Sequence, residues 1–156
     1  MFVGEHIVKL DARGRGLFPA VLKRQMKGSE DKGFVLKRDI FEKCLVLYPM
    51  AEWDRENSIL QKRLNPYNKE HAVFMRQFYR GTAELFLDAN NRLLLPKRLI
   101  TEIDAEKDLV FAGLDRKIEI WSLDSWNNMR QLDDFGSLAE KLLGQSENLF
   151  DDNEIS

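Results

Sequence analysis

The stretch LDARGR at Leu10–Arg15, followed by Pro19, recurs 77 residues later as LDANNR at Leu87–Arg92, followed by Pro96. The Asp, the Arg four positions on and the downstream proline keep the same spacing in both copies. A short motif that returns with its neighbours in register is stronger evidence than either copy alone. The repeat predicts one fold unit that is used twice.

The similarity continues beyond the motif. Lys32–Leu36 resembles Lys107–Phe111 at an offset of 75 residues, and Leu45–Tyr48 resembles Ile118–Trp121 at an offset of 73. An offset that falls along the chain is typical of elements joined by loops of different length. We therefore expect the second copy to repeat whole elements of the first.

Length and composition indicate a globular protein. The chain has 156 residues, 44% hydrophobic and 32% charged, enough for one domain or two closely packed half-domains. No apolar run approaches the roughly 18 residues of a membrane span, and Phe2-Val3-Gly4 follows Met1 without a leader. We expect a cytoplasmic protein without a signal peptide. The single cysteine, Cys44, is expected to be a small buried side chain.

The charge is unevenly distributed along the chain. Residues 133–156 carry a net charge of −6, which leaves +4 on residues 1–132 of a chain whose total is −2. Within residues 9–27 there are six bases and one acid, a net charge of +5. A basic N-terminal repeat beside an acidic tail predicts a polarised molecule with an anionic partner for its basic part.

The pattern predicts an α+β fold. In the first copy it favours a strand over 5–10, a turn over 11–16, a short helix from Pro19 and strands over 34–37 and 44–48. An insert follows, with one helix over 50–64 and another that opens at Asn65-Pro66 and runs to Tyr79. In the second copy the pattern predicts strands over 83–87, 109–112 and 117–121 and a short helix over 96–103.

Two weaker helices are expected after the second copy. Ser122 or Asp124 is a candidate cap for a helix that runs to 132, and a further helix is expected over 137–143. The resulting division is a first repeat at 1–53, a helical insert at 54–80 within the same globular unit, a second repeat at 81–132 and an acidic tail at 133–156. We expect that tail to be mobile.

The repeated turn is the candidate binding site. A carboxylate at Asp11 or Asp88 can accept backbone N–H groups two or more residues on. Gly14 allows a positive φ, and Asn91 is the next best residue at the same position. The turns therefore present Arg15 and Arg92 from a stiff backbone. A guanidinium on a β-ribbon suits guanine O6 and N7 in the major groove, or phosphate.

An alternative is that each Asp pairs with the Arg of its own turn as an internal salt bridge. In the first copy Arg13 and Arg15 outnumber Asp11, so at least one guanidinium is left for an external anion. The second copy has Asn90 in place of Arg13 and fits internal pairing better.

These motifs, with Phe2-Val3-Gly4-Glu5, Leu47-Tyr48-Pro49 and Glu52-Trp53, closely resemble the MraZ family of bacterial regulators from Met1 to about Trp126. The resemblance implies two AbrB-like halves of the double-psi or swapped-hairpin type. It also implies a transcriptional repressor of the division and cell wall gene cluster, including its own promoter. Members form rings, octamers or dodecamers, and bind closely spaced G-rich direct repeats in double-stranded DNA.

Carried over residue by residue, the resemblance places Arg15 and Arg92 at the DNA-contacting positions and Asp11 and Asp88 at the paired acids. We expect Lys9, Arg13 and Lys23 to contact phosphates, and the protein to associate with the nucleoid. Two positions depart from the family pattern. Asn91 stands where the second turn usually has Gly, and Gly16 stands where an aliphatic residue commonly follows the first Arg.

Two other classes of function are alternatives. An enzyme finds little support, because His6 and His71 are 65 residues apart and no nucleophile or phosphate-loop motif is present. We expect no cofactor and no metal. The second class is a self-assembling module that binds only phosphate, with an interface drawn from some of its aromatic residues. Core packing is expected for most of them (Trp53, Phe74, Phe78, Tyr79, Trp121 and Trp126).

Overall fold

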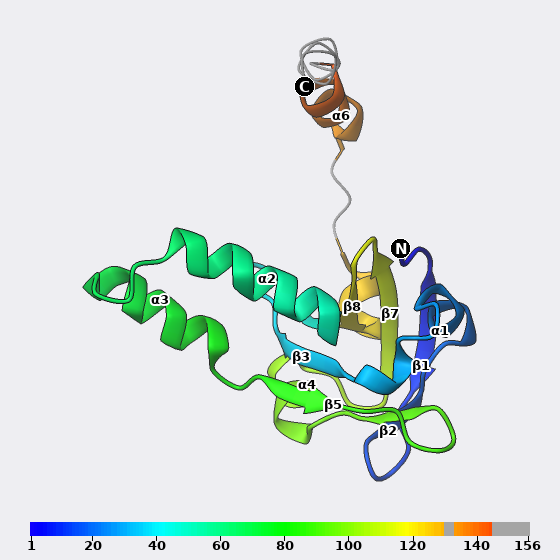
Figure 1. The fold of residues 1–156 in the computed structure, drawn as a ribbon. Helices are drawn as coiled ribbons and strands as arrows, with labels where there is room; N and C mark the ends of the chain where they lie inside the picture. The colour runs from blue at the N-terminus through cyan, green and yellow to red at the C-terminus, as the bar shows by residue number, and fades with distance from the viewer. Residues whose placement is uncertain (130–132, 145–156) are drawn as a thin grey trace.

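The computed structural model describes residues 1–129 and 133–144, and each half of the chain supplies two strands, a short helix and two further strands in the same order (Figure 1). The first half contains β1 (Glu5–Lys9), β2 (Arg15–Leu17), α1 (Ala20–Gln25), a 3-10 turn η1 (Glu30–Lys32), β3 (Phe34–Arg38) and β4 (Leu45–Pro49). The second half contains β5 (Ala83–Leu85), β6 (Arg92–Leu94), α4 (Lys97–Glu102), β7 (Asp108–Leu114) and β8 (Lys117–Ser122). The predicted α+β class and its repeated elements are confirmed.

The two halves exchange their first strands. The larger sheet has six strands in the order β1-β7-β8-β4-β3-β5, and all of its pairings are antiparallel. β1 of the first half pairs with β7 of the second, and β5 of the second half pairs with β3 of the first. Neither half can complete its part of this sheet without the other.

A pseudo-two-fold axis relates the halves. At the centre of the larger sheet, Val46 of β4 is opposite Glu119 of β8, and these two residues are equivalent in the repeat. The second, two-stranded sheet pairs β2 with β6, and there Gly16 is opposite Leu93, again equivalent residues. In each sheet the axis thus passes between two residues that are equivalent in the repeat. This is the geometry expected when a unit pairs with its own copy.

One hydrophobic core serves both halves. Phe18 is 2% exposed and packs on Phe34 of its own half, with ring centroids 5.3 Å apart, and on Phe111 of the other half at 6.3 Å. Leu22 of α1 and Leu99 of α4 occupy equivalent positions and are both buried. Burial of each large apolar side chain contributes about 1.5–3 kcal/mol, so the shared core ties the two halves together.

The short helices begin as the prolines predict. Pro19 and Pro96 precede α1 and α4 with nearly the same backbone angles, φ −58° and ψ 127° against φ −59° and ψ 130°. Proline suits this position because the first N–H groups of a helix have no partner within the helix. The strands β2 and β6 were not separated from the turns by the sequence pattern, because three residues are too few to show an alternation.

The helices α2 (Met50–Arg63) and α3 (Lys69–Tyr79) connect the two halves, and the predicted insert at 54–80 lies within this helical segment. The prediction that α3 opens at Asn65-Pro66 is wrong. The Oδ1 atom of Asn65 accepts from the N–H of Tyr67 at 3.0 Å and forms a separate turn, and Asn68 then caps the helix by accepting from Glu70 and His71. Asn65 therefore forms the turn, and Asn68, three residues later, forms the N-cap of the helix.

Aromatic rings fasten the insert to the sheet. Trp53 of α2 stacks with Phe78 of α3 at 6.1 Å and meets Tyr48 of β4 at 5.5 Å. The ammonium group of Lys37 lies 4.0 Å from the centre of the Phe78 ring. Of the aromatics expected in the core, Phe78 and Trp121 are buried, whereas Phe74 and Tyr79 are more than a third exposed.

The C-terminal elements are α5 (Leu123–Asn127) and α6 (Phe135–Leu143). Ser122 caps α5, since its Oγ atom accepts from the N–H of Ser125 at 3.0 Å. The expected helix over 124–132 ends earlier, at Asn127, and 130–132 lie outside the described residues. The expected mobility of the tail concerns chiefly 145–156, which also lie outside them. No helix of the described part is long and apolar enough to cross a membrane.

Gly16 departs from the aliphatic residue of the family pattern, and its position explains the difference. A Cβ atom at Gly16 would lie 2.7 Å from Cγ1 of Val8 and 3.0 Å from Cδ2 of Leu10. The equivalent Leu93 points into the core and is 1% exposed. Leu93 therefore fills the space beneath β6 with its own side chain, whereas Val8 and Leu10 occupy the space next to Gly16.

Gly16→Ala is expected to lower the free energy of unfolding by about 1–3 kcal/mol, because Val8 must move to admit the methyl group. Denaturant unfolding of the single variants and of a Val8→Ala/Gly16→Ala double variant measures the coupling. In the Val8→Ala background the cost of Gly16→Ala should largely vanish. An equal cost in both backgrounds would show that the collision with Val8 is not the cause.

Candidate nucleic-acid interface

The two repeated turns have the same hydrogen bonds. Oδ1 of Asp11 accepts from the backbone N–H groups of Arg13 and Arg15, both at 2.9 Å. Oδ1 of Asp88 accepts from those of Asn90 at 2.8 Å and Arg92 at 2.9 Å. In both copies the carboxylate thus accepts the backbone N–H groups two and four residues on.

Both turns need a left-handed residue at the same position. Gly14 has φ 85° and Asn91 has φ 60°. Asparagine tolerates this region better than most residues with a side chain, so the family's usual glycine is not required there. The Oδ1 atom of Asn91 also accepts from the ammonium group of Lys23 at 2.6 Å, a contact for which Gly14 has no side chain.

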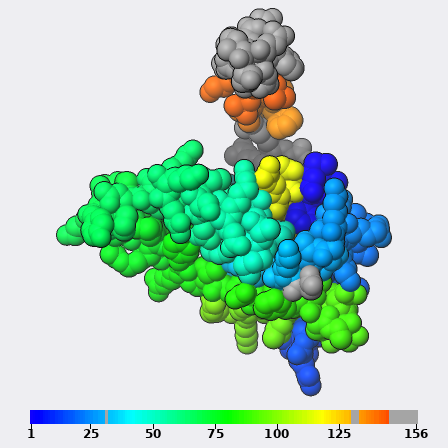
Figure 2. All heavy atoms as spheres, in the orientation of Figure 1, coloured from blue at the N-terminus to red at the C-terminus, as the bar shows by residue number. Residues whose placement is uncertain are grey.

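Each turn is braced by the strand that follows the other turn. The N–H of Leu95 donates to the carbonyl of Gly14 at 3.0 Å, and the N–H of Phe18 donates to the carbonyl of Asn91 at 2.9 Å. These crossed bonds extend the β2–β6 ribbon into both turns. In Figure 2 the first turn, in blue, projects at the lower edge of the molecule beside the green second turn.

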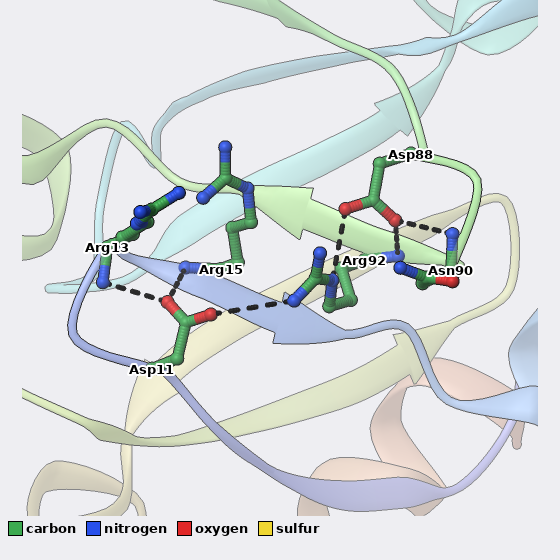
Figure 3. Close-up of polar contacts among 6 residues, drawn as sticks. All are labelled: Asp11, Arg13, Arg15, Asp88, Asn90 and Arg92. Atoms are coloured by element: carbon green, nitrogen blue, oxygen red, sulfur yellow. Dashed lines mark hydrogen bonds and ion pairs between the residues drawn. The ribbon is translucent and has the colours of Figure 1, made fainter.

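The charges of the two turns are unequal. Nε of Arg92 lies 3.0 Å from Oδ2 of Asp88, and an Nη atom of Arg92 lies 3.8 Å from Oδ2 of Asp11. Figure 3 shows Arg92 between the two carboxylates and the guanidinium group of Arg15 turned away from them. Among the described residues no carboxylate lies within 4.0 Å of that group. The alternative of an internal salt bridge therefore holds for the second turn, whereas Asp11 pairs with Arg92 rather than with Arg15.

Both acids are held in the charged form. The backbone N–H of Arg15 is the main cause that lowers the pKa of Asp11 below 3.8, and the N–H of Arg13 and the charge of Arg92 add to it. The backbone N–H of Arg92 is likewise the main cause that lowers the pKa of Asp88, with a contribution from its guanidinium group. Hydrogen bonds to a carboxylate favour its ionised state. At neutral pH both turns therefore carry a fixed negative charge at their base.

The remaining predicted bases occupy different settings. Arg13 is exposed in the first turn. Lys23, from α1, reaches the second turn through Asn91. Lys9 ends β1, where its ammonium group lies 4.0 Å from a carboxylate oxygen of Asp108. The fold thus brings Arg13, Arg15, Lys23 and Arg92 to the two turns, while Lys9 has an acidic neighbour of its own.

A groove of about 810 Å³ lies beside the first turn, and the sequence did not predict it. Its lining includes Arg13 of the turn together with Lys97 and Lys107 of the second half. Acids balance these charges, because Asp11, Asp104 and Glu106 line the same groove. Lys97 follows Pro96 where Ala20 follows Pro19, so aligning the two repeats shows an additional base in the second copy. The alignment does not show that Lys97 lies in a groove with the first turn.

One group of potential metal ligands occurs in the described part of the chain. Ligand atoms of Asp39, Cys44 and Glu119 lie within 4.8 Å of one another. Burial raises the pKa of the Cys44 thiol well above its ordinary value, which disfavours the thiolate that a metal would need. Both carboxylates already accept hydrogen bonds, Asp39 from backbone N–H groups and Glu119 from the indole of Trp121. Cys44 itself is buried, as expected.

The fold and the site define a class of protein: a duplicated α+β chain whose halves share one sheet and present paired Asp-x-x-x-Arg turns. Comparison with known proteins agrees. The sequence profile of a family described as "MraZ protein, putative antitoxin-like" matches residues 1–76 and 78–145. The chain belongs to the MraZ family.

Curated relatives extend over nearly the whole chain. A protein of Phocaeicola vulgatus is 35% identical over 149 residues, which cover 95% of this chain and 97% of its own. One of Flavobacterium psychrophilum is 40% identical over 144 residues, 91% of each chain. One of Bacteroides fragilis is 38% identical over 144 residues, 91% of this chain and 90% of its own. Each is named "Transcriptional regulator MraZ", which is the name of a regulator and not of an enzyme.

The lowered pKa values of Asp11 and Asp88 predict how the turns respond to acid. Because each pKa is lower in the folded state than the ordinary 3.8, their contribution to stability is complete above that value. It is lost as the pH falls through the lower, folded-state values. In a titration followed by ¹H–¹⁵N NMR, the amide signals of Arg15 and Arg92 should move with midpoints below 3.8.

Asp88→Asn is the matched control, since it keeps a side-chain oxygen acceptor and removes the titrating group. The acid-dependent shift at the Arg92 amide should disappear in this variant, while the shift at the Arg15 amide remains. Midpoints at or above 3.8 for both amides would contradict the assignment of these hydrogen bonds to charged carboxylates.

Proposed function

We propose that this chain is a sequence-specific DNA-binding transcriptional regulator, a repressor that reads G-rich direct repeats through its paired Asp-x-x-x-Arg turns. The genes it controls are a bacterial division and cell wall cluster, its own promoter included. It acts in the cytoplasm on the nucleoid, as a ring of identical subunits, octameric or dodecameric. It uses no cofactor or metal. The names of its relatives support the regulatory role.

The observation that carries the proposal is the setting of Arg15. Its backbone N–H is fixed by Asp11, its strand is paired to β6, and its guanidinium group has no carboxylate partner among the described residues. A planar fork on a stiff two-stranded ribbon suits the major groove, where Arg binds guanine O6 and N7 with two hydrogen bonds. Each such contact discriminates against a wrong base by about 1–3 kcal/mol.

The other bases have supporting roles. Arg13, beside Arg15 in the first turn, contacts phosphate together with Lys9 and Lys23. Arg92 occupies the equivalent of the Arg15 position and also faces the DNA, but its two carboxylate contacts reduce the positive charge that it offers. Asp11 and Asp88 shape the turns. The first turn is therefore the principal reader of each subunit.

Assembly explains how so small a site reaches useful affinity. One subunit with one main guanine contact binds weakly, but linked sites on successive repeats raise affinity through effective concentration. Direct repeats match the rotational symmetry of a ring, in which neighbours face the same way along the DNA. Palindromes would instead match a two-fold dimer.

The exchange of first strands supports AbrB-like swapped-hairpin halves as the origin of the fold. We assign 1–53 to the first repeat, 54–80 to the helical insert, 81–132 to the second repeat and 133–156 to the acidic tail. The competing function is a self-assembling module that binds phosphate without sequence preference. The exposed Arg13 would serve either function, whereas a fixed and unpaired Arg15 favours sequence reading.

Fluorescence anisotropy tests the proposal with the duplex upstream of this protein's own gene and a scrambled duplex of equal composition, across a salt series. The native duplex should bind tighter by about 10³-fold or more, with an affinity that falls steeply with salt. Arg15→Ala should abolish most of this preference, and Arg15→Lys should retain salt dependence but not preference. Light scattering should show an unchanged assembly in both variants.

Arg63→Ala is the matched control, because Arg63 is an exposed arginine at the far end of α2. Its removal should lower affinity for both duplexes equally or not at all. Equal binding of the two duplexes by the unmodified protein would favour simple phosphate binding, and no binding would favour the self-assembling module. A full preference retained in Arg15→Ala would contradict the assigned role of Arg15.

A further inference from the structure

The outer face of the β2–β6 ribbon carries two leucines as well as two arginines. Arg15 is directly opposite Leu94, and Leu17 is directly opposite Arg92. The residues between them, Gly16 and Leu93, are buried. Because alternate residues of a strand share a face, these four side chains form one surface, with the arginines on one diagonal and the leucines on the other.

The two leucines have no role in the core. Leu17 is 63% exposed and Leu94 is 49% exposed. They are equivalent in the repeat, so each copy places a leucine two residues after its arginine. An isolated exposed leucine needs no explanation, but a symmetric pair within a four-residue binding surface indicates an apolar ligand group at two matched positions.

We propose that Leu17 and Leu94 are specificity-determining residues that contact thymine 5-methyl groups in the major groove, beside the guanine bound by Arg15. This inference rests on the proposed DNA-binding function. The thymine methyl is the apolar group among the base edges exposed in the major groove, and apolar side chains recognise it there. The ribbon thus reads a mixed sequence, guanine by its guanidinium groups and thymine by its leucines.

The spacing of the ribbon fits this assignment. Side chains directly opposite each other on antiparallel strands are about 5 Å apart at Cβ, and successive bases are about 3.4 Å apart along a DNA strand. Leu94, opposite Arg15, therefore reaches a base one or two steps from the guanine. A subunit contact on this face is less favourable, because it would bury Arg15 together with the leucines and leave a guanidinium without a partner.

The test uses the full chain and two versions of the upstream duplex, one natural and one with deoxyuridine in place of every thymine. Deoxyuridine keeps all hydrogen-bonding groups and removes only the methyl. The unmodified protein should bind the uracil duplex about fourfold more weakly for each methyl that it contacts. A Leu17→Ala/Leu94→Ala variant should bind the natural duplex more weakly and no longer distinguish the two.

Leu114→Ala is the matched control, since Leu114 is 50% exposed at the end of β7 and outside the ribbon. It should keep the full thymine preference. Equal affinity of the unmodified protein for both duplexes, with the scrambled duplex still rejected, would overturn the leucine inference and leave the proposed function intact. Failure to reject the scrambled duplex would instead overturn the proposed function. Loss of assembly in the leucine variant would reassign the leucines to a subunit contact.

Discussion

β1 finds its hydrogen-bond partner in β7 of the other half, and β5 finds its partner in β3. Because the first strands are exchanged, β2 and β6 pair with each other on the pseudo-two-fold axis, and the two turns project side by side. The crossed bonds from Leu95 to Gly14 and from Phe18 to Asn91 then fix both turns against the same ribbon. The site is therefore a product of the pairing of halves, and a single half would not form it.

Symmetry of the backbone does not extend to the charges. Both carboxylates of the motif face Arg92, so the charge of Arg92 in the second turn is largely neutralised. In the first turn the guanidinium group of Arg15 has no carboxylate partner among the described residues. The same asymmetry appears at the axis, where Gly16 faces Leu93. The duplicated backbone thus carries two turns that differ in charge pairing and in the side chain at the axis.

Much of this arrangement follows from the sequence. The repeat predicted which elements recur, and Pro19 and Pro96 marked the helix starts, because their chemistry is local. The residue pattern alone does not identify the pairing partners of β1 and β5, since either half could in principle close on itself; only the family resemblance pointed to swapped hairpins. The partner of Asp11 was also missed, because Arg92 is 81 positions away and approaches only after the halves have paired.

The most direct test of the central claim is dimethyl sulphate footprinting on the upstream duplex. The reagent methylates N7 of guanine in the major groove and N3 of adenine in the minor groove. If the ribbon enters the major groove with Arg15 on guanine, guanine N7 should be protected once in each repeat and adenine N3 should stay reactive. Protection of adenine N3 with guanine N7 still reactive would contradict the account.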